Sequence, residues 1–276
     1  MKEFNQKVAV ITGAGGGIGR ELSLQLARQG CDLALADISE ENVTETQRQA
    51  QQLGVKASIH LVDVGDAEAY QAFVAEVIDS HGKVNLLFNN AGITLQRSFE
   101  NHSIEDWDLV LRVNLWGVIH GCKFFLPHLK AADEAHIVNL SSMAGFLGLP
   151  NQASYSSTKA AVRMLSETLA TELARFNIGV TSVHPGAIAT NMIRNTLDRA
   201  DDQAKAKKTL ETVEKMAMPV EKAASTILTA VNNKSFRVRI GKDSVLLDLL
   251  KRWMPVMLHK LIIHKMSGAK RAVAQS

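Results

Sequence analysis

Short apolar runs alternate along the chain with longer segments in which apolar residues recur at helical spacing. The apolar runs predict strands over residues 7–12, 31–37, 56–63, 83–90, 135–142, 178–186 and 235–241. The longer segments predict helices from the glycines after the first strand to about residue 29, then over 38–54, 66–81, 103–131 and 152–176, the fourth interrupted near Pro127. Strands this apolar are buried on both faces, and the helices between them indicate parallel pairing through right-handed crossovers. We therefore expect a single-domain α/β fold, a doubly wound, mostly parallel seven-stranded sheet with helices on both faces.

The hydrophobic pattern divides the chain into a domain over residues 1–242 and an extension over 243–276. A polar insertion at about 187–218 follows the sixth strand, where a doubly wound sheet binds its ligand. It could form a lid over the site, or a pair of surface helices with no part in binding. The extension places Leu246, Leu250, Trp253, Met257 and Leu261 near helical spacing, with Pro255 either kinking one helix or starting a second.

Charge sets the extension apart from the rest of the chain. The net charge is +3, yet from Leu249 onward there are six lysines and arginines and no aspartate or glutamate. The remainder is mildly acidic, which gives little support to a nucleic-acid partner. The basic, amphipathic stretch 243–266 could cover a partner subunit or the substrate pocket, lie on an anionic membrane, or pack on its own domain.

Composition indicates an ordinary soluble globular protein, with 46% hydrophobic and 21% charged residues. The two cysteines, Cys31 and Cys122, each lie in an apolar stretch, so we expect buried thiols rather than a disulfide or a metal site. The first residues lack the pattern of a signal peptide, and no run of 18 uncharged apolar residues occurs. We therefore expect a cytoplasmic protein, with membrane association only through the extension.

A glycine-rich turn, TGAGGGIG at residues 12–19, follows the first strand and opens a helix. Glycines there let the backbone approach a pyrophosphate, whose charge the helix N-terminus favours, which predicts a Rossmann-type dinucleotide site. Asp37 ends the second strand, where a carboxylate accepts hydrogen bonds from a ribose and repels a 2′-phosphate. Its neighbours Ala36, Ile38 and Ser39 offer no cation, so NAD is favoured, with NADP as the alternative. A helix-capping role for Asp37 also stays open.

Tyr155 and Lys159 lie four residues apart in the helix predicted over 152–176, so they share one face. A free tyrosine has a pKa near ~10 and is a poor acid or base at neutral pH. An ammonium ~4 Å from the phenol oxygen would favour the phenolate by about 4 kcal/mol, roughly three pKa units. The pair alone is common on ordinary helices. Ser142, 13 residues upstream at the end of the fifth strand, adds a hydroxyl that can hydrogen-bond a substrate oxygen.

Over residues 5–241 the sequence resembles the short-chain dehydrogenase/reductase family. The matching motifs are TGAGGGIG (12–19), Asp63 in LVDV, NNAG (89–92), Asn114 in RVNLWG, Ser142, YSSTK (155–159) and PGAIAT (185–190). The resemblance implies that Tyr155 is the acid/base, that Lys159 lowers its pKa and binds the nicotinamide ribose, and that Ser142 orients the substrate. It also implies an Asn114-bound water, an Asp63 contact with adenine and a Thr190 contact with the carboxamide. The resulting cofactor site comprises Gly13, Gly15, Gly17, Ile18, Gly19, Asp37, Asp63, Val64, Asn90, Ala91, Gly92, Tyr155, Lys159, Pro185, Gly186, Ile188 and Thr190.

The loops expected to face the substrate, 143–150, 93–95 and 188–193, carry mostly apolar side chains. We expect substrate contacts from Ser142, Ala144, Phe146, Leu149, Tyr155 and Met192. Such a wall favours a lipophilic ketone or secondary alcohol, although Arg97 and Arg194 could meet an anion. The prediction is an NAD(H)-dependent oxidoreductase that assembles as a homodimer or homotetramer and holds no metal. The alternatives are an NADP-linked 3-oxoacyl reductase and a non-catalytic nucleotide-binding regulatory protein.

Overall fold

The protein is built on one seven-stranded parallel sheet. The computed structural model describes residues 3–190, 192 and 200–273, without the side chains of 205, 209, 213, 216 and 265–273. The strand order is β3-β2-β1-β4-β5-β6-β7, and every adjacent pair is parallel. The strands are β1 (Val8–Thr12), β2 (Asp32–Asp37), β3 (Ala57–Leu61), β4 (Leu86–Asn89), β5 (Ala135–Leu140), β6 (Ile178–Pro185) and β7 (Arg237–Ile240). The predicted α/β fold and its seven strands are confirmed.

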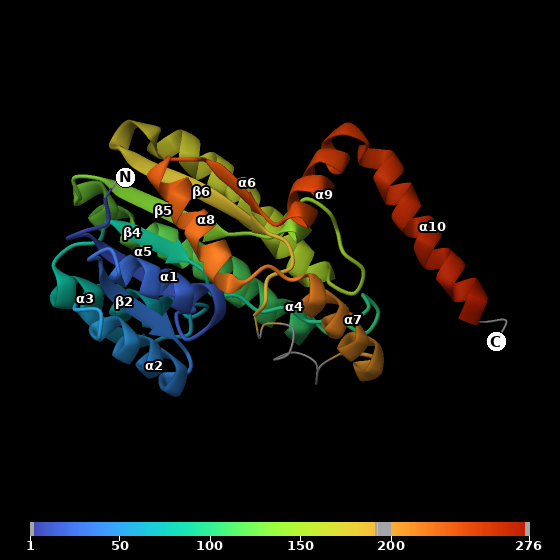
Figure 1. The fold of residues 1–276 in the computed structure, drawn as a ribbon, viewed down its shortest axis with the longest axis horizontal. Helices are drawn as coiled ribbons and strands as arrows, with labels where there is room; N and C mark the ends of the chain where they lie inside the picture. The colour runs from blue at the N-terminus through green and yellow to red at the C-terminus, as the bar shows by residue number, and fades with distance from the viewer. Residues whose placement is uncertain (1–2, 191, 193–199, 274–276) are drawn as a thin grey trace.

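Helices cover both faces of this sheet (Figure 1). They are α1 (Gly17–Ala27), α2 (Glu40–Gln51), α3 (Ala67–His81), α4 (Ile104–Leu111), α5 (Gly117–Ala131), α6 (Ala153–Leu173), α7 (Gln203–Met216), α8 (Val220–Asn232), α9 (Lys242–Trp253) and α10 (Pro255–Val273). One core cluster joins the sheet to α1, α2 and α8, and the other joins it to α3, α5 and α6.

The strand sequences explain why both faces are covered. All five residues of β1 are buried, and successive side chains point to opposite faces. Ala9 and Ile11 belong to the cluster with α1, α2 and α8, whereas Val10 belongs to the other. A continuous apolar run therefore requires a helix layer on each side. The carboxyl ends of β1, β4 and β5 then open side by side, which places their following loops at one edge.

The interruption expected near Pro127 is wrong. Pro127 lies inside α5, on its exposed side, where water can hydrogen-bond the carbonyl that loses its intrahelical partner. The irregularity comes earlier, as a π-helical turn over Arg112–Trp116 that contains Asn114. Within the described residues, the continuous helix Ile104–Ala131 is the one stretch long and apolar enough to suit a membrane span. Phe125 and Leu129 are fully buried in the core, so we interpret it as a core helix.

The boundary expected at residue 242 also differs from the structure. α9 starts directly after β7 and is bonded into the domain, because the Ser244 hydroxyl donates to the His184 carbonyl at 2.7 Å and Asp248 is buried. Pro255 starts a second helix, α10, which projects away from the body (Figure 1). The domain therefore includes α9, and α10 alone forms an arm.

Candidate active site

The glycine turn between β1 and α1 has the shape that a dinucleotide requires. Gly13 has a φ of +65°, which favours glycine. A Cβ on Gly19 would lie 2.1 Å from the Gly13 carbonyl oxygen, so only glycine fits there. Gly16 is the N-cap of α1, and no side chain caps this helix. The first N–H groups of α1 therefore remain available to an anion, which fits a pyrophosphate.

Asp37 is held against this turn by two backbone N–H groups. Its carboxylate accepts from Gly15 at 2.8 Å and from Ser39 at 3.0 Å. Sequence neighbours alone suggested that no cation is near, but the structure brings Arg20 to the same turn. Its guanidinium donates to the Gly15 and Asn42 carbonyls and to the Thr46 hydroxyl. Arg20 is therefore engaged beside the carboxylate, a feature that bears on the choice between NAD and NADP.

Thr12 joins the glycine turn to the NNAG segment after β4. Its Oγ accepts from the N–H groups of Asn90 and Ala91 at 3.0 and 3.1 Å. The Asn90 amide donates in return to the carbonyls of Thr12 and Gly13. The two predicted cofactor segments thus form one rigid unit, and Thr12 is a positioning residue that the sequence analysis did not single out.

The Ser142 and Tyr155 hydroxyls meet at the carboxyl end of β5. Ser142 follows this strand, and its Oγ accepts from the Ala144 N–H at 3.1 Å. Tyr155 lies in the first turn of α6, half-buried, and its hydroxyl is close enough to that of Ser142 for Ser142 to lower its pKa. Burial has the larger, opposite effect and raises the pKa of Tyr155. Ser141 faces the other way, as expected, and donates to the Lys159 carbonyl.

Lys159 lies one helical turn after Tyr155 and is 2% exposed. Its Nζ donates to the Leu140 carbonyl at 2.8 Å and lies 5.7 Å from the centre of the Tyr155 ring. Burial lowers the pKa of Lys159 to about 8. The pKa of Tyr155 is raised in this arrangement, because burial of the phenol outweighs the lowering expected from this lysine, whose ammonium is bonded to a carbonyl.

Asn114 stands behind Lys159 in the π-helical turn and is fully buried. Its amide exchanges two 2.8 Å hydrogen bonds with the backbone of Ile93. A Cβ on Gly92 would lie 3.2 Å from Asn114 Oδ1 and 3.3 Å from Lys159 Nζ, so the three residues meet at one point. Asn114 Oδ1 has a second lone pair that could accept a hydrogen bond from the implied water. That water stays a prediction.

The PGAIAT loop closes the other side of the glycine turn. A Cβ on Gly17 would lie 3.1 Å from Thr190 Cγ2, and these two residues border a cavity of about 310 Å³. Asp243 of α9 holds this loop, because its carboxylate accepts from the Ala187 N–H at 2.8 Å. A Cβ on Gly186 would collide with the same carboxylate at 2.1 Å. Asp243 therefore positions this loop. The predicted boundary at residue 242 had assigned it to the C-terminal extension, away from the cofactor site.

The other predicted cofactor residues take mixed positions. Asp63 accepts from the Gly65 N–H at 2.9 Å and pairs with Arg112 at 3.3 Å. The Val64 side chain is buried, and its carbonyl is bonded to His120 Nδ1 at 2.9 Å. Pro185 ends β6, and the partly buried Ile18 and Ile188 pack against the core. Their contacts with a cofactor stay predictions.

The Phe146 side chain packs into the domain. Its ring stacks on His184 at 4.2 Å and lies 4.4 Å from the Arg237 guanidinium carbon, with only 9% of the residue exposed. The Ala144 N–H donates to Ser142 at the end of β5, and the N–H of the half-buried Leu149 donates to Ser156 of α6. Because the Phe146 ring packs on His184 and beside Arg237, its contact with a substrate stays a prediction.

Of the two arginines that could meet an anion, Arg97 and Arg194, the structure describes only Arg97. Arg97 pairs with Asp106 at 2.7 Å, on the loop that leads to α4. Arg194 lies outside the described residues, as does Ile193, whereas Met192 is half-buried.

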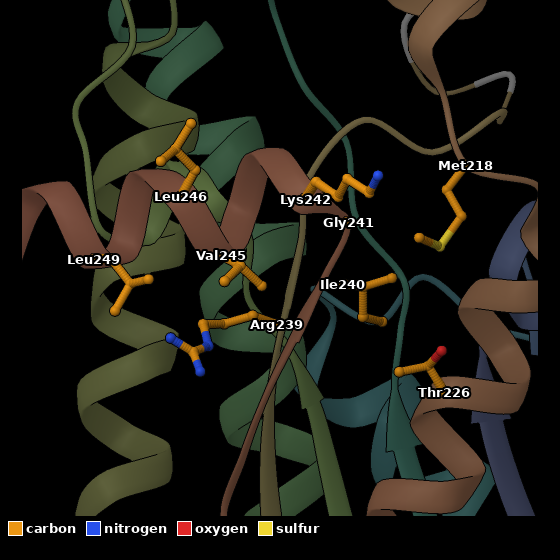
Figure 2. A pocket seen from close by; sticks show the side chains of 9 residues that line it. All are labelled: Met218, Thr226, Arg239, Ile240, Gly241, Lys242, Val245, Leu246 and Leu249. Atoms are coloured by element: carbon orange, nitrogen blue, oxygen red, sulfur yellow. The ribbon is translucent and has the colours of Figure 1, made fainter.

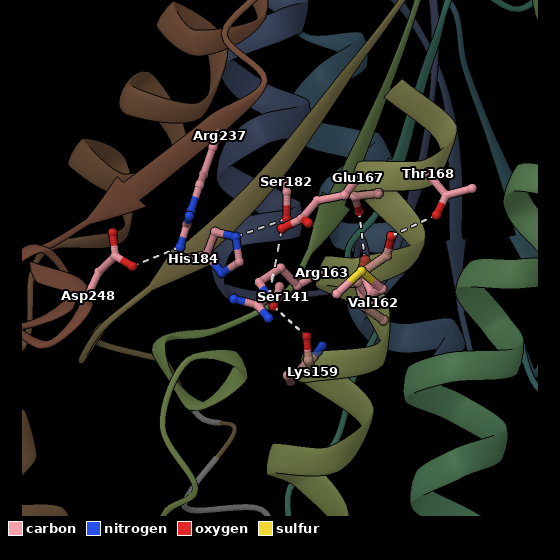
Figure 3. Close-up of polar contacts among 12 residues, drawn as sticks. Ser141, Lys159, Val162, Arg163, Glu167, Thr168, Ser182, His184, Arg237 and Asp248 are labelled. Atoms are coloured by element: carbon pink, nitrogen blue, oxygen red, sulfur yellow. Dashed lines mark hydrogen bonds and ion pairs between the residues drawn. The ribbon is translucent and has the colours of Figure 1, made fainter. Parts of the chain in front are cut away.

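A chain of contacts runs from α9 to Ser142, and Figure 3 shows its Asp248–Arg237 pair with His184 nearby. Asp248 accepts from Arg237 at 2.8 Å, and the Arg237 guanidinium lies over the Phe146 ring. That ring stacks on His184, whose Nδ1 donates to the Ser142 carbonyl at 3.2 Å. Burial lowers the pKa of His184 to about 3, so it stays neutral. The sequence carries one sign of these contacts: Asp248 lies inside the apolar run VLLDLLKRW, where a buried carboxylate needs a partner.

The insertion over 187–218 is anchored at both sides of the site. Ala187 and Ala189 exchange backbone hydrogen bonds with Met218 at 2.9 and 3.0 Å. Asp201 accepts from the Ser98 N–H at 2.8 Å, in the loop after β4. These contacts place the described part of the insertion next to the active-site loops, while residues 191 and 193–199 lie outside the described residues.

Comparisons with known proteins agree with this geometry. Residues 7–201 match the short chain dehydrogenase family. SadH, a predicted oxidoreductase of Mycobacterium tuberculosis, is 38% identical over 265 residues, which cover 95% of this chain and 96% of SadH. The 3-oxoacyl-(acyl-carrier-protein) reductase FabG of Thermotoga maritima is 36% identical over 198 residues, 72% of this chain and 80% of FabG. The solved structure of a short chain dehydrogenase/reductase from Burkholderia phymatum in complex with NAD has a TM-score of 0.85 at 30% identity, covering 91% of this chain and 95% of that one. The chain therefore belongs to the short chain dehydrogenase family.

Proposed function

We propose that this oxidoreductase transfers a hydride between NAD(H) and a lipophilic ketone or secondary alcohol. The observation that carries the proposal is the pair of neighbouring hydroxyls on Ser142 and Tyr155 at the carboxyl end of β5. Lys159 and Asn114 stand behind them, and the glycine turn opens at the same edge of the sheet. A site that only binds a nucleotide has no use for these paired hydroxyls, which argues against a regulatory protein without turnover.

The chain's own residues supply orientation and a proton. The nicotinamide, when bound, supplies or accepts the hydride. In the reductive direction the Ser142 hydroxyl hydrogen-bonds the carbonyl oxygen, and the Tyr155 hydroxyl donates its proton to that oxygen. In the oxidative direction Tyr155 takes the proton back. Because burial raises the pKa of Tyr155, the phenol is protonated at neutral pH and is ready to donate.

Lys159 compensates the charge that remains on Tyr155 after the transfer. With a pKa of about 8 it carries a positive charge at neutral pH, one helical turn from the phenol. Charge in a buried site is felt more strongly than in water, so this ammonium favours the developing phenolate. Lys159 lies too deep to protonate the substrate directly, and we assign it the role of tuning Tyr155.

NAD is the favoured cofactor because of Asp37. A carboxylate held by the N–H groups of Gly15 and Ser39 repels the extra phosphate of NADP and can accept from ribose hydroxyls. The solved structure of the Burkholderia relative, in complex with NAD, supports this preference. A preference for NADP would require Arg20 to bind the 2′-phosphate, but its guanidinium already has three partners.

A 3-oxoacyl reductase is the second candidate. The relative that favours it is FabG of Thermotoga maritima, whose name states that activity. Such a substrate is also a ketone, so the same hydroxyl pair would serve. The apolar side chains Leu149 and Met192 favour a lipophilic group beside the carbonyl in either case.

One kinetic panel separates these candidates. Purified protein is assayed with aliphatic and alicyclic ketones, their secondary alcohols and a 3-oxoacyl thioester, each with NAD(H) and NADP(H). We expect the highest kcat/KM for a lipophilic ketone or alcohol with NAD(H). Higher kcat/KM for the 3-oxoacyl thioester with NADPH would establish the second candidate, and cofactor binding without turnover of any substrate would favour a regulatory protein.

A further inference from the structure

α9 has an inverted amphipathic pattern. It turns the polar Ser244 and Asp248 toward the domain, where both are buried. Its apolar residues Leu246, Leu249 and Trp253 face outward instead, and Trp253 is 83% exposed. An outward apolar stripe is unusual for a helix packed on a domain, because burial of such side chains normally drives the packing.

α10 continues this apolar surface away from the body. Val256, Met257, Leu261 and Ile263 are all more than half exposed. We call these four residues, together with Leu246, Leu249 and Trp253, the arm surface. A helix over Pro255–Val273 is about 28 Å long at ~1.5 Å per residue, so the surface extends well beyond the domain (Figure 1).

An apolar groove adjoins the arm surface at its base (Figure 2). Its volume is about 450 Å³, the larger of the two cavities described here. The lining residues are Met218, Thr226, Arg239, Ile240, Gly241, Lys242, Val245, Leu246 and Leu249. Leu246 and Leu249 thus belong to both features. Lys242 adds a cation beside the apolar wall, whereas Arg239 is paired with Asp248 at 3.0 Å.

We propose that the arm surface and its groove bind an anionic lipid bilayer. The charge of this region supports that partner, because from Leu249 onward the chain has six lysines and arginines and no acidic residue. Lys251 and Lys260 alternate along the chain with the exposed apolar side chains, and the exposed Arg252 is paired with Asp248 at 3.3 Å. An interfacial helix buries its apolar side chains at the acyl boundary while its cations meet anionic headgroups. Trp253, at the junction of the two helices, is a residue type that favours that interface.

A second copy of the chain is the other partner to consider. Two α10 helices packed on each other would bring their lysines together, and no aspartate or glutamate follows Asp248 in the chain to neutralise them. A bilayer avoids this repulsion and gains from the same charges. The bilayer is therefore the partner that both the apolar and the charged residues favour.

Vesicle sedimentation of the full-length protein tests the proposal. We expect binding to vesicles of phosphatidylcholine with phosphatidylglycerol, and much weaker binding to pure phosphatidylcholine. Trp253→Ser/Leu261→Ser should lower the partition coefficient at least about tenfold, since two large apolar side chains leave the interface. The matched control Leu61→Ser/Ile104→Ser changes two exposed apolar residues elsewhere and should stay within about twofold of wild type.

Charge reversal tests the electrostatic part. Lys251→Glu/Lys260→Glu should lower binding to anionic vesicles at least about tenfold, whereas Lys83→Glu/Lys123→Glu, with the same change of net charge, should have a smaller effect. Equal binding to neutral and anionic vesicles, or no binding by wild type, would overturn the proposal. So would native mass spectrometry in which the apolar double variant loses an assembly that wild type forms without lipid. Sedimentation requires no turnover, so failure here is separate from failure of the proposed activity.

Discussion

Replacing Asp248 with asparagine removes the charge that joins α9 to β7. The carboxylate is 2% exposed and accepts from Arg237 at 2.8 Å, Arg239 at 3.0 Å and Arg252 at 3.3 Å. The amide of the introduced asparagine would keep one acceptor oxygen but turn N–H donors toward guanidinium donors. The partly buried guanidinium groups of Arg237 and Arg239 would then lose their negatively charged partner.

The structure sets the size of this effect. Breaking a buried ion pair by removing one partner costs about 3–5 kcal/mol. The Arg237 side chain is 19% exposed and that of Arg252 is 54% exposed, so water compensates part of the loss. We expect the free energy of unfolding to fall by about 2–3 kcal/mol, which for a chain of this size lowers Tm by about 5–10 °C.

Thermal unfolding of Asp248→Asn beside Arg252→Gln measures this effect. The control removes the most exposed partner and should cost less than about 1 kcal/mol. Because Arg237 also supports Phe146 and His184 against Ser142, kcat should fall in Asp248→Asn while cofactor affinity holds. A Tm within about 2 °C of wild type would refute the reasoning, since the buried carboxylate would then carry no net stabilisation.

Three further predictions concern the cofactor site. Asp37→Ser should raise the NADP-to-NAD ratio of kcat/KM at least about tenfold, and an unchanged ratio would show that this carboxylate does not select the cofactor. Gly19→Ala places a Cβ 2.1 Å from the Gly13 carbonyl oxygen and should abolish cofactor binding in a calorimetric titration. The control Gly16→Ala, whose Cβ would have no atom within 4 Å, should bind the cofactor normally. Equal binding by the two variants would contradict the tight turn. Burial lowers the pKa of Lys159 from 10.5 to about 8, so the folded protein releases this proton at lower pH than the unfolded chain. Denaturant titrations should therefore show wild type gaining about 3 kcal/mol over Lys159→Met between pH 8 and 10.5, and a constant difference would argue against the buried ammonium.

The strands and the glycine turn were predictable because local patterns specify them. A continuous apolar run such as residues 8–12 indicates a strand buried on both faces, and TGAGGGIG between strand and helix indicates a tight turn. The ends of β5 and the start of α6 follow from the same alternation. The placement of the Ser142 hydroxyl at the ligand end of the sheet, alongside the Tyr155 phenol, follows from where a parallel sheet ends its strands.

The contacts that sequence could not predict are those between distant segments. Phe146 looked like part of an apolar substrate wall, but its direction depends on His184 and Arg237, which belong to other strands. The division at residue 242 followed from a change in composition, whereas Asp243 and Asp248 hold α9 in place by tertiary bonds.

The Tyr155 pKa shows a second kind of limit. Helical spacing correctly brings Lys159 to the same side of α6, and a Coulomb estimate then lowers the pKa of the phenol. The structure adds the burial of the phenol and the Leu140 carbonyl that binds the ammonium, and burial reverses the direction of the shift. Desolvation depends on all surrounding segments, so spacing within one helix cannot supply it.

Single-turnover hydride transfer by Tyr155→Phe tests the central claim most directly. The chain has two tyrosines, and Tyr70→Phe is the matched control because its hydroxyl is buried in α3 without a partner among the described residues. Each variant is loaded with NADH and mixed with the best ketone, and nicotinamide oxidation is followed in time. We predict that Tyr155→Phe loses at least about 10²-fold in the transfer rate while NADH affinity stays within about threefold, and that Tyr70→Phe matches wild type. Transfer by Tyr155→Phe at the wild-type rate would contradict the assignment of Tyr155 as the proton donor.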